Sequence, residues 1–360
     1  MTARRIGQRL AALALFALAA APLAARAADG TAFYAGKTLT YIVATAPGGS
    51  YDFYGRLIAR HMAEHLPGVA VVVRNMPGKG HLLGADALYE ATADGLTIGT
   101  FSTGLIYDQL IERPDVRFDL SRMSWIGKAA SDPRILIVGA NSPIHRIKDL
   151  HQPGDPFLFA VSRIGSLNYN ETKILQAALG FNARIISGYR STDDELAIEN
   201  RSIDAVFGPK SLYGSFVATG KGRAVFQIGG SDPDVPQLSD LIRRKGSADA
   251  KSVVALIRSQ AELARLTAGP PGIPAERLDA LRAAYRAALE SPKLQEEAAK
   301  ANRPVVPFAV GDDVAREVSA ALDQSPATID AIAQTFLAPP PALIANAPRT
   351  KPSITPVPAR

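Results

Sequence analysis

Two segments of the sequence combine glycine with small polar side chains just before an expected helix, a pattern that suits the binding of an anion. In the first, a Pro-Gly-Gly turn separates an apolar stretch at 39–44 from an amphipathic stretch at 52–66. Glycine lets backbone N–H groups approach a ligand closely, and the start of a helix offers unpaired N–H donors with a partial positive charge. A carboxylate fits there. The contacts expected in this segment are Pro47, Gly48, Gly49, Ser50 and Asp52.

An ordinary tight turn also explains these residues, because Ser50 or Asp52 is a good cap for the helix that follows. The sequence leaves both interpretations open. A phosphate-binding P-loop is excluded, since no Gly-Lys-Ser/Thr closes the segment.

The second segment, 162–170, follows an apolar stretch at 157–161 and leads into a helical pattern near Glu171. If the two segments face each other, two helix N-termini point into one cleft. Each charge–dipole interaction contributes ~0.3–1 kcal/mol and each hydrogen bond to a charged group ~1.5–3 kcal/mol, enough together to hold a small dicarboxylate without an arginine clamp. Polar residues after two other expected strands are candidates for the rim of the cleft, although such residues are usually plain loops. The contacts expected here are Gly165, Ser166 and Asn168, with Ser102, Thr103 and Tyr189 at the rim.

Hydrolytic chemistry has one weak signal, the pattern H-x-x-E-H at His61–His65, which matches an inverted zinc-peptidase motif. Helical spacing places both histidines with Tyr54 and Leu57 on the apolar side of the helix, which favours a structural role, and no third metal ligand follows. The sequence contains no Gly-x-Ser-x-Gly nucleophile motif. We therefore expect no metal, no cofactor and no enzymatic activity. A secreted metal-dependent or serine hydrolase is the alternative from another class.

The elements that must position these residues are strands and helices in alternation, which predict an α/β protein of two lobes with a hinge between them, each lobe a mostly parallel sheet flanked by helices. The pattern restarts after Pro133, and the late helices are expected to return and cover the first lobe. The stretch 252–266 fits either a helix or a strand. The boundaries expected are 28–131 plus 251–337 for lobe 1, 132–250 for lobe 2, and 338–360 for a Pro-rich, disordered tail.

The N-terminal 27 residues carry four arginines, no acidic residue and an apolar run of 12 residues, which is typical of a secretory signal peptide. A membrane anchor is the alternative, but such a run falls short of the ~20 residues that span a bilayer. Cleavage near Ala27 removes those four positive charges and leaves about +2 of the formal net charge of +6, so no nucleic-acid binding is expected. The absence of Cys excludes disulfides and Cys-ligated zinc. We expect a periplasmic protein without stable membrane insertion.

The chain resembles the extracytoplasmic solute-binding proteins of tripartite tricarboxylate transporters, often called Bug proteins, through short motifs that occur in order along it. The turn at 46–49 followed by Asp52 resembles the family's Pro-Gly-Gly-x-x-Asp segment. Residues 74–80 resemble its Asn-x-Pro-Gly-x-Gly turn, and residues 93–97 its Asp-Gly-Tyr-Thr segment. Further matches occur at 188–190, 203–205, 220–224, 233–236 and 272–274.

The resemblance implies the hinge-bending fold of type II periplasmic binding proteins, with a small organic carboxylate held between the lobes by backbone N–H groups, small hydroxyls and ordered waters. It implies delivery of the ligand to membrane transporter subunits, and we add Asp204 to the expected site and expect a monomer. The chain departs from the family pattern in a bulky segment at 163–170, in Tyr51 and Tyr54 beside the first turn, and in His81, where the turn usually continues with glycine. A ligand-loaded periplasmic sensor is the alternative, which the sequence does not separate from transport.

Overall fold

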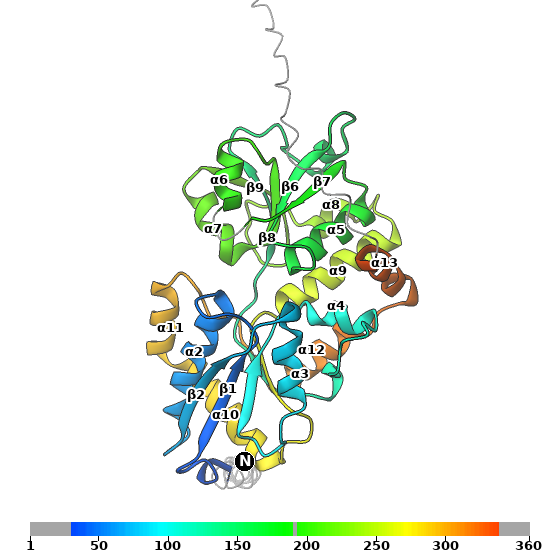
Figure 1. Ribbon diagram of the computed structural model, residues 1–360. Helices are drawn as coiled ribbons and strands as arrows, with labels where there is room; N and C mark the ends of the chain where they lie inside the picture. Colours follow the sequence, from blue (N-terminus) through cyan, green and yellow to red (C-terminus); the bar gives the residue numbers. More distant parts are fainter. Residues whose placement is uncertain (1–29, 190–192, 338–360) are drawn as a thin grey trace, which may run out of the picture.

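The structure is a computed structural model that describes residues 30–189 and 193–337, and it consists of two α/β lobes (Figure 1). Each lobe has one sheet with helices on both of its faces. The two-lobed α/β fold that the sequence predicts is confirmed.

The first lobe contains a six-stranded sheet of order β11-β4-β10-β3-β1-β2. The strands β1 to β3 are parallel, whereas β10 and β11 run antiparallel to their neighbours, so the sheet is mixed. Its elements are β1 (Thr38–Val43), α2 (Ser50–Ala63), β2 (Ala70–Asn75), η1 (Lys79–His81), α3 (Leu82–Tyr89), β3 (Thr97–Thr100), α4 (Leu105–Leu110), η2 (Leu120–Arg122), β4 (Ser124–Lys128), β10 (Leu266–Gly269), α10 (Ala275–Glu290), α11 (Pro292–Lys300), β11 (Ala309–Val310) and α12 (Asp312–Leu322).

Alternation along β1 builds a core on each face of this sheet, because successive side chains of a strand point to opposite faces. Leu39 and Tyr41 are buried in the cluster that includes α2, α10 and α11. Ile42 and Ala44 are buried in the cluster that includes α3, α4 and α12. The carboxyl end of β1 is thereby fixed from both sides, directly before the Pro-Gly-Gly turn.

The second lobe contains a five-stranded sheet of order β7-β6-β8-β5-β9. Its strands β6, β7 and β8 are parallel, and β5 runs antiparallel to both of its neighbours, so this sheet is mixed as well. Its elements are β5 (Arg134–Gly139), η3 (Ile147–His151), β6 (Phe157–Val161), α5 (Leu167–Leu179), β7 (Ala183–Ser187), α6 (Asp193–Glu199), β8 (Ala205–Pro209), α7 (Lys210–Ala218), β9 (Gly222–Ile228) and α8 (Leu238–Ile242).

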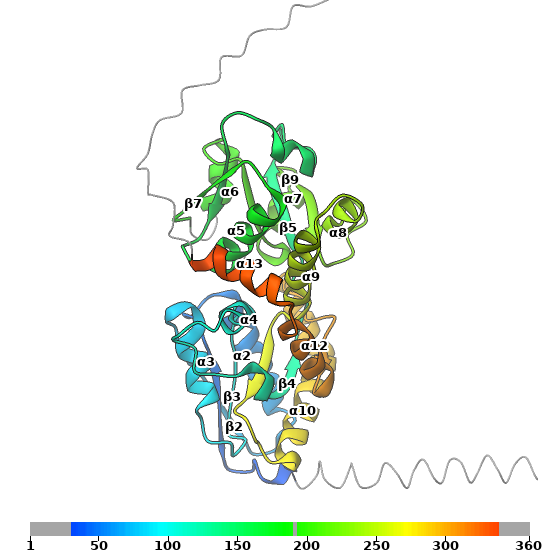
Figure 2. The same ribbon diagram turned by 90° about the vertical axis from the view of Figure 1, so that its right-hand side faces the viewer.

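Two further helices join the lobes. The stretch that fits either a helix or a strand contains both: α9 (Ala248–Glu262) packs on α5 and β9, and its chain then enters β10 of the first sheet. The last helix, α13 (Pro326–Leu337), contacts α5 and α9. Figure 2 shows α13 lying across the junction, so this late helix extends to the second lobe. The residue boundaries of the lobes remain a prediction.

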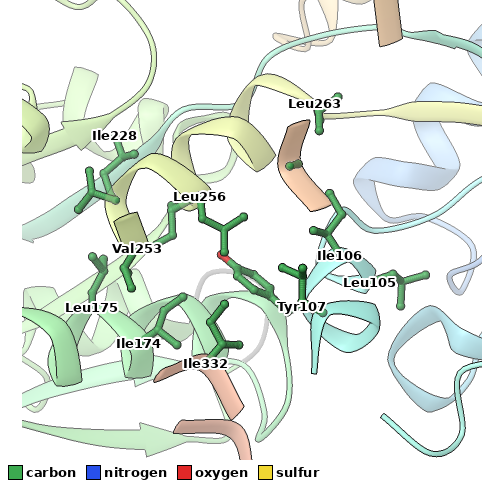
Figure 3. Close-up of a cluster of buried hydrophobic side chains, with 14 of the residues drawn as sticks. Leu105, Ile106, Tyr107, Ile174, Leu175, Ile228, Val253, Leu256, Leu263 and Ile332 are labelled. Carbon is green, nitrogen blue, oxygen red and sulfur yellow. The ribbon is translucent and has the colours of Figure 1, made fainter. Parts of the chain in front are cut away.

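The junction is held by a buried apolar cluster drawn from both lobes (Figure 3). Tyr107 of α4, Ile174 of α5, Leu256 of α9 and Ile332 of α13 all belong to it and are almost fully buried. Burial of such side chains stabilises the contact by ~1.5–3 kcal/mol each relative to exposure.

The expected signal peptide at 1–27 and the expected tail at 338–360 lie outside the described residues. Within the part that the structure describes, no helix combines the length and the apolar character needed to cross a bilayer.

Candidate ligand-binding site

The first loop, residues 44–49, runs from the carboxyl end of β1 to the start of α2 and is held by Asp52. The Asp52 carboxylate accepts hydrogen bonds from the Gly48 N–H at 2.9 Å, from Asn75 Nδ2 at 2.8 Å and from Arg56 Nε at 2.9 Å. Burial opposes ionisation of this carboxyl, but the three donors outweigh it and hold its pKa below the usual value. Asp52 therefore fixes the loop as an anion at neutral pH.

The start of α2 carries no side-chain cap. Gly49 occupies the N-cap position, and Ser50 and Asp52 lie inside the helix, so neither of them is the cap that the sequence allowed. Gly48 has a φ of +86°, a conformation that favours glycine. The buried Thr45 Oγ1 has no hydrogen-bond partner among the described residues. An exposed glycine turn thus leads into a helix start with N–H groups available for an anion.

The second loop, residues 162–166, is held mainly by its own side chains. Ser166 caps α5 by accepting from the Tyr169 N–H at 3.4 Å, and its hydroxyl lies 2.6 Å from Asn168 Oδ1. Gly165 is exposed and has a φ of +77°. Ser166 and Asn168 therefore shape the loop, and its exposed side chains include Arg163.

Residues 102–104, which follow β3, lie where the lobes meet. Ser102 and Thr103 are buried. A Cβ atom added to Gly104 would lie 3.2 Å from Leu167 Cδ1, at the first residue of α5. The structure therefore brings this segment of the first lobe against the start of α5.

Tyr189 and Asp204 lie at opposite ends of the second sheet. The Tyr189 N–H donates to the carbonyl of Val161, the last residue of β6, at 3.3 Å, so Tyr189 lies at the same edge as the second loop. The Asp204 carboxylate accepts from the Leu158 N–H, near the start of β6, at 2.7 Å. Asp204 therefore links the start of β8 to β6, and the structure does not bring it to the two loops.

A cavity of about 490 Å³ lies between the lobes near α4 and α13. Of the expected site residues that the structure describes, Gly165 lines it, whereas the first loop does not. Its walls include Asp108, Arg113, Asp115, Tyr169 and Phe336. Burial raises the pKa of Asp108, and Arg113 is paired with both aspartates, at 3.2 and 2.8 Å. The walls of the cavity therefore combine aromatic side chains with one arginine that is paired to two aspartates.

Comparison with known sequences decides the family. Residues 55–333 match the sequence profile of the family described as "Tripartite tricarboxylate transporter family receptor", TctC. The chain belongs to the TctC family. The resemblance to Bug-type solute-binding proteins that the motifs suggest is thereby confirmed.

Curated relatives of this TctC-family chain cover it in part. A "UPF0065 protein in tcbD-tcbE intergenic region" of Pseudomonas sp. strain P51 is 37% identical over 148 residues, which is 41% of this chain and 42% of the relative. "Protein BugT" of Bordetella pertussis is 29% identical over 180 residues, 48% of this chain and 53% of the relative. The chain thus spans about half the length of these curated relatives.

Solved structures share the fold over most of the chain. The structure of the periplasmic binding protein BugD has a TM-score of 0.62 at 20% identity, and the match covers 82% of this chain and 97% of BugD. MatC (Rpa3494) from Rhodopseudomonas palustris, solved with bound malate, has a TM-score of 0.60 at 20% identity, and the match covers 82% of this chain and 99% of MatC. R. palustris Rpa4515 with adipate has a TM-score of 0.61 at 19% identity, and the match covers 83% of this chain and 97% of Rpa4515.

This TctC-family chain also carries a polar junction that the sequence analysis missed. Arg265, just before β10, places its Nη2 atom 2.7 Å from Asp132 Oδ2, and Ser211 of α7 donates to the same oxygen at 2.7 Å. The guanidinium carbon lies 5.0 Å from the centre of the Tyr51 ring and 4.9 Å from that of Tyr54. Arg265 therefore connects the first turns of α2 with the start of α7 in the second lobe.

A second buried ion pair lies beside it. Arg134 Nε is 2.8 Å from Glu171 Oε2, and both side chains are almost fully buried. Burial raises the pKa of Glu171 despite the attraction of Arg134. These partners stand 37 residues apart, and the Arg265 and Asp132 partners stand 133 apart. In the sequence, each member of the two pairs is marked only as a charged residue on or beside an apolar stretch.

The H-x-x-E-H pattern does not assemble a metal site. His61 is fully buried, with Nδ1 3.7 Å from Glu64 and Nε2 3.4 Å from Glu297. No group of three or more His, Asp or Glu residues in the described ranges is arranged to hold a metal ion. The structural role that helical spacing favoured fits His61, which packs beneath α11.

Proposed function

We propose that this chain is an exported solute-binding protein that captures a small organic carboxylate between its lobes and delivers it to a tripartite tricarboxylate-type membrane transporter. The observation that carries the proposal is the first loop, in which Asp52 fixes a glycine turn against an uncapped helix start. Membership of the TctC family supports the transport role, and the malate and adipate named for two structural neighbours support the ligand class.

In this proposal the ligand carboxylate accepts hydrogen bonds from the backbone of the first loop and first turn of α2. The second loop approaches from the other lobe, residues 102–104 follow the strand next to β1 in the first lobe, and Tyr189 lies at the rim. Contacts from both lobes favour the closed arrangement, because the ligand binds it more tightly than an open one. The residues proposed to contact the ligand are Pro47, Gly48, Gly49, Ser50, Ser102, Thr103, Gly165, Ser166, Asn168 and Tyr189, with Asp52 acting through the loop.

The location of the protein is part of the same proposal. Residues 1–27 act as a signal peptide that is cleaved near Ala27, and the mature protein works in the periplasm as a monomer. The partners are a small organic acid and the membrane subunits of the transporter.

A thermal-shift screen of the mature protein against mono-, di- and tricarboxylates tests the proposal. A ligand at 100 times its Kd adds ~2.7 kcal/mol to the free energy of unfolding, which raises Tm measurably. The decisive variant is Gly49→Leu. Gly49 has a φ of −81°, and the nearest atom to an added Cβ is 4.0 Å away, so the free protein tolerates the side chain.

In that variant we expect an unchanged Tm without ligand and no shift with ligand, because the side chain occupies the space in front of the first turn. Gly214→Leu is the matched control, since an added Cβ there meets only Lys210 Cγ at 3.8 Å. A ligand shift that survives in Gly49→Leu removes the first loop from the site.

A further inference from the structure

Two segments that cross between the lobes, one from β4 to β5 and one from α9 to β10, are bonded to each other. The Ala129 N–H donates to the carbonyl of Arg265 at 3.3 Å, and the Asp132 N–H donates to the carbonyl of Ala261 at 2.7 Å. These backbone hydrogen bonds fix the two crossings side by side. Arg265 therefore lies at a point from which a long side chain can reach both lobes.

The guanidinium of Arg265 is anchored to the second lobe. Its Nη2 atom lies 2.7 Å from Asp132 Oδ2 and 3.4 Å from the Ser211 hydroxyl oxygen. Ser211, in the first turn of α7, donates its N–H to Asp132 Oδ1 at 3.1 Å and its hydroxyl to Oδ2 at 2.7 Å. A helix start favours a carboxylate because its first N–H groups have no partner within the helix. Asp132 thus holds Arg265 against the start of α7.

The same guanidinium faces the first turn of α2 in the first lobe. Its central carbon lies 5.0 Å from the centre of the Tyr51 ring and 4.9 Å from that of Tyr54, within the range of cation–π attraction. The Tyr54 hydroxyl also donates to the carbonyl of Pro304 at 2.9 Å, which holds this ring in place. Both tyrosines depart from the family pattern, so this contact is a feature of the present chain.

A second contact between the lobes lies one turn further along α7. Asn302 Nδ2, in the segment between α11 and β11, donates to the Ser215 hydroxyl oxygen at 3.4 Å. Ser211 and Ser215 are four residues apart and therefore share one face of the helix. Figure 1 shows α7 on the side of the second lobe that faces α2 and α11. The face of α7 that carries both serines is thus turned toward the first lobe.

Arg265 is held at a cost in free energy. Its φ is +60°, which disfavours a residue other than glycine, and its buried Nε atom has no hydrogen-bond partner within residues 30–189 and 193–337. Its ion pair with Asp132 is buried, and such a pair adds little stability compared with well-packed apolar side chains. The arrangement that Arg265 imposes on its neighbours therefore explains this residue better than stability does.

We propose that Arg265 is a positioning residue, which holds the first turn of α2 against the start of α7 and so sets how the lobes face each other before a ligand binds. This inference rests on the proposed function, because the first turn of α2 is where the carboxylate is placed. Loss of the Arg265 contacts lowers the fraction of molecules in the binding-competent arrangement, and the apparent Kd rises in inverse proportion to that fraction.

Two variants remove the contact between Arg265 and α2 in different ways. Tyr51→Leu removes an aromatic ring and leaves the ion pair with Asp132 intact, whereas Arg265→Lys retains a positive charge without the planar group that stacks on the rings. Calorimetric titration with succinate, adipate and citrate measures Kd, and small-angle X-ray scattering measures the radius of gyration. We expect each variant to raise Kd about tenfold and to increase the radius of gyration of the free protein. Saturating carboxylate should restore the wild-type radius, since the ligand then favours the closed arrangement.

Phe53→Leu is the matched control. It removes a ring from the same turn of α2, but this ring lies 5.0 Å from the guanidinium carbon of Arg303, within the first lobe. We expect Kd within twofold of wild type and an unchanged radius of gyration. Tyr51→Phe retains the ring over Arg265 and should recover most of the affinity that Tyr51→Leu loses. In the double variant, Tyr51→Leu should raise Kd less than twofold above that of Arg265→Lys, because both changes remove the same contact.

The outcomes separate the positioning role from the proposed function. If none of the three carboxylates binds the wild-type protein, the proposed function fails, and the radius of gyration of the free variants decides the role of Arg265. If carboxylates bind but both variants keep the wild-type Kd and radius, the proposed function stands and the positioning role is wrong. A lower Tm with Kd and radius unchanged leaves Arg265 a structural role only. Fully additive losses in the double variant overturn the link through Tyr51.

Discussion

Removal of the Asp52 carboxylate probes the feature on which the site depends. Asp52→Ala deletes the acceptor for the Gly48 N–H, for Asn75 Nδ2 and for Arg56 Nε, at 2.9, 2.8 and 2.9 Å. The first loop then loses its link to the body of α2, and its side-chain link to β2 is reduced to the hydrogen bond that Asn75 Nδ2 donates to the Thr45 carbonyl at 3.0 Å. We expect a protein that still folds but holds residues 46–49 in many conformations.

The loss of unfolding free energy in Asp52→Ala can be worked out from the exposure of each of the three donors. A hydrogen bond to a charged group contributes ~1.5–3 kcal/mol. The Arg56 side chain is 49% exposed, so its ion pair is screened and worth only ~0–1 kcal/mol. The Gly48 N–H lies in an exposed loop and regains water in the variant. The hydrogen bond from the Asn75 amide therefore accounts for most of the loss, and the three lost interactions together lower the unfolding free energy by about 2–3 kcal/mol.

Ligand affinity falls for a further reason, because the loop must be ordered again on each binding event. We expect Kd to rise about 10- to 100-fold, which corresponds to roughly 1.4–2.8 kcal/mol. Urea unfolding measures the stability change, and calorimetric titration with the carboxylate found in the thermal-shift screen measures Kd. Arg56→Ala is the control and should change either quantity by less than ~1 kcal/mol. If Asp52→Ala leaves the urea midpoint of unfolding unchanged and Kd within twofold of wild type, the loop does not depend on this carboxylate.

Three further measurements test other parts of the account. Because the pKa of Asp52 is lowered in the folded state, its contribution to the free energy of unfolding is complete above the unfolded-state pKa near 4 and is lost as the pH falls through the folded-state pKa. Asp52→Asn should therefore be less stable than wild type at neutral pH, and this difference should shrink in acid titrations followed by circular dichroism. His81, with a pKa of about 4 when folded, contributes stability above pH ~6.5 that is lost toward pH 4 with a slope of at most ~1.4 kcal/mol per pH unit; His81→Asn should flatten this slope between pH 7 and 5 in urea unfolding, and an unchanged slope would contradict a buried neutral imidazole. Glu171→Ala should cost about 3–5 kcal/mol in the same assay because the buried Arg134 loses its carboxylate partner and keeps only the carbonyl of Asp132, whereas the double variant Arg134→Met with Glu171→Leu should cost less; equal costs would refute the pairing.

The parts of the fold that follow from local pattern were predictable from the sequence. Alternation at Leu39, Tyr41 and Ile42 marks a strand with two buried faces, and both faces are buried in the structure. The glycine turn before α2 was likewise predictable, because its residue types are dictated by backbone conformation at that point. The stretch 252–266 resisted assignment because it contains a helix and the start of a strand.

Other features depend on where distant segments meet. Asp204 matched a family motif, but only the pairing of β6 with β8 places it at the strand starts, away from the loops. Arg265 and Asp132 are 133 residues apart, and each looks like an ordinary charge beside an apolar stretch until the chain crossings bring them together. The positive φ of His81 fits a position where the family turn usually continues with glycine, but the side chain alone does not predict it.

The central claim, that a carboxylate is held by the first loop between the lobes, is tested most directly by a crystal structure of the mature protein with the carboxylate that gives the largest thermal shift. We predict one carboxylate within hydrogen-bond distance of the N–H groups of Gly49 to Tyr51, with the second loop closed over it. A carboxylate bound instead in the cavity beside Asp108 and Phe336, with no contact to residues 47–50, would contradict the account.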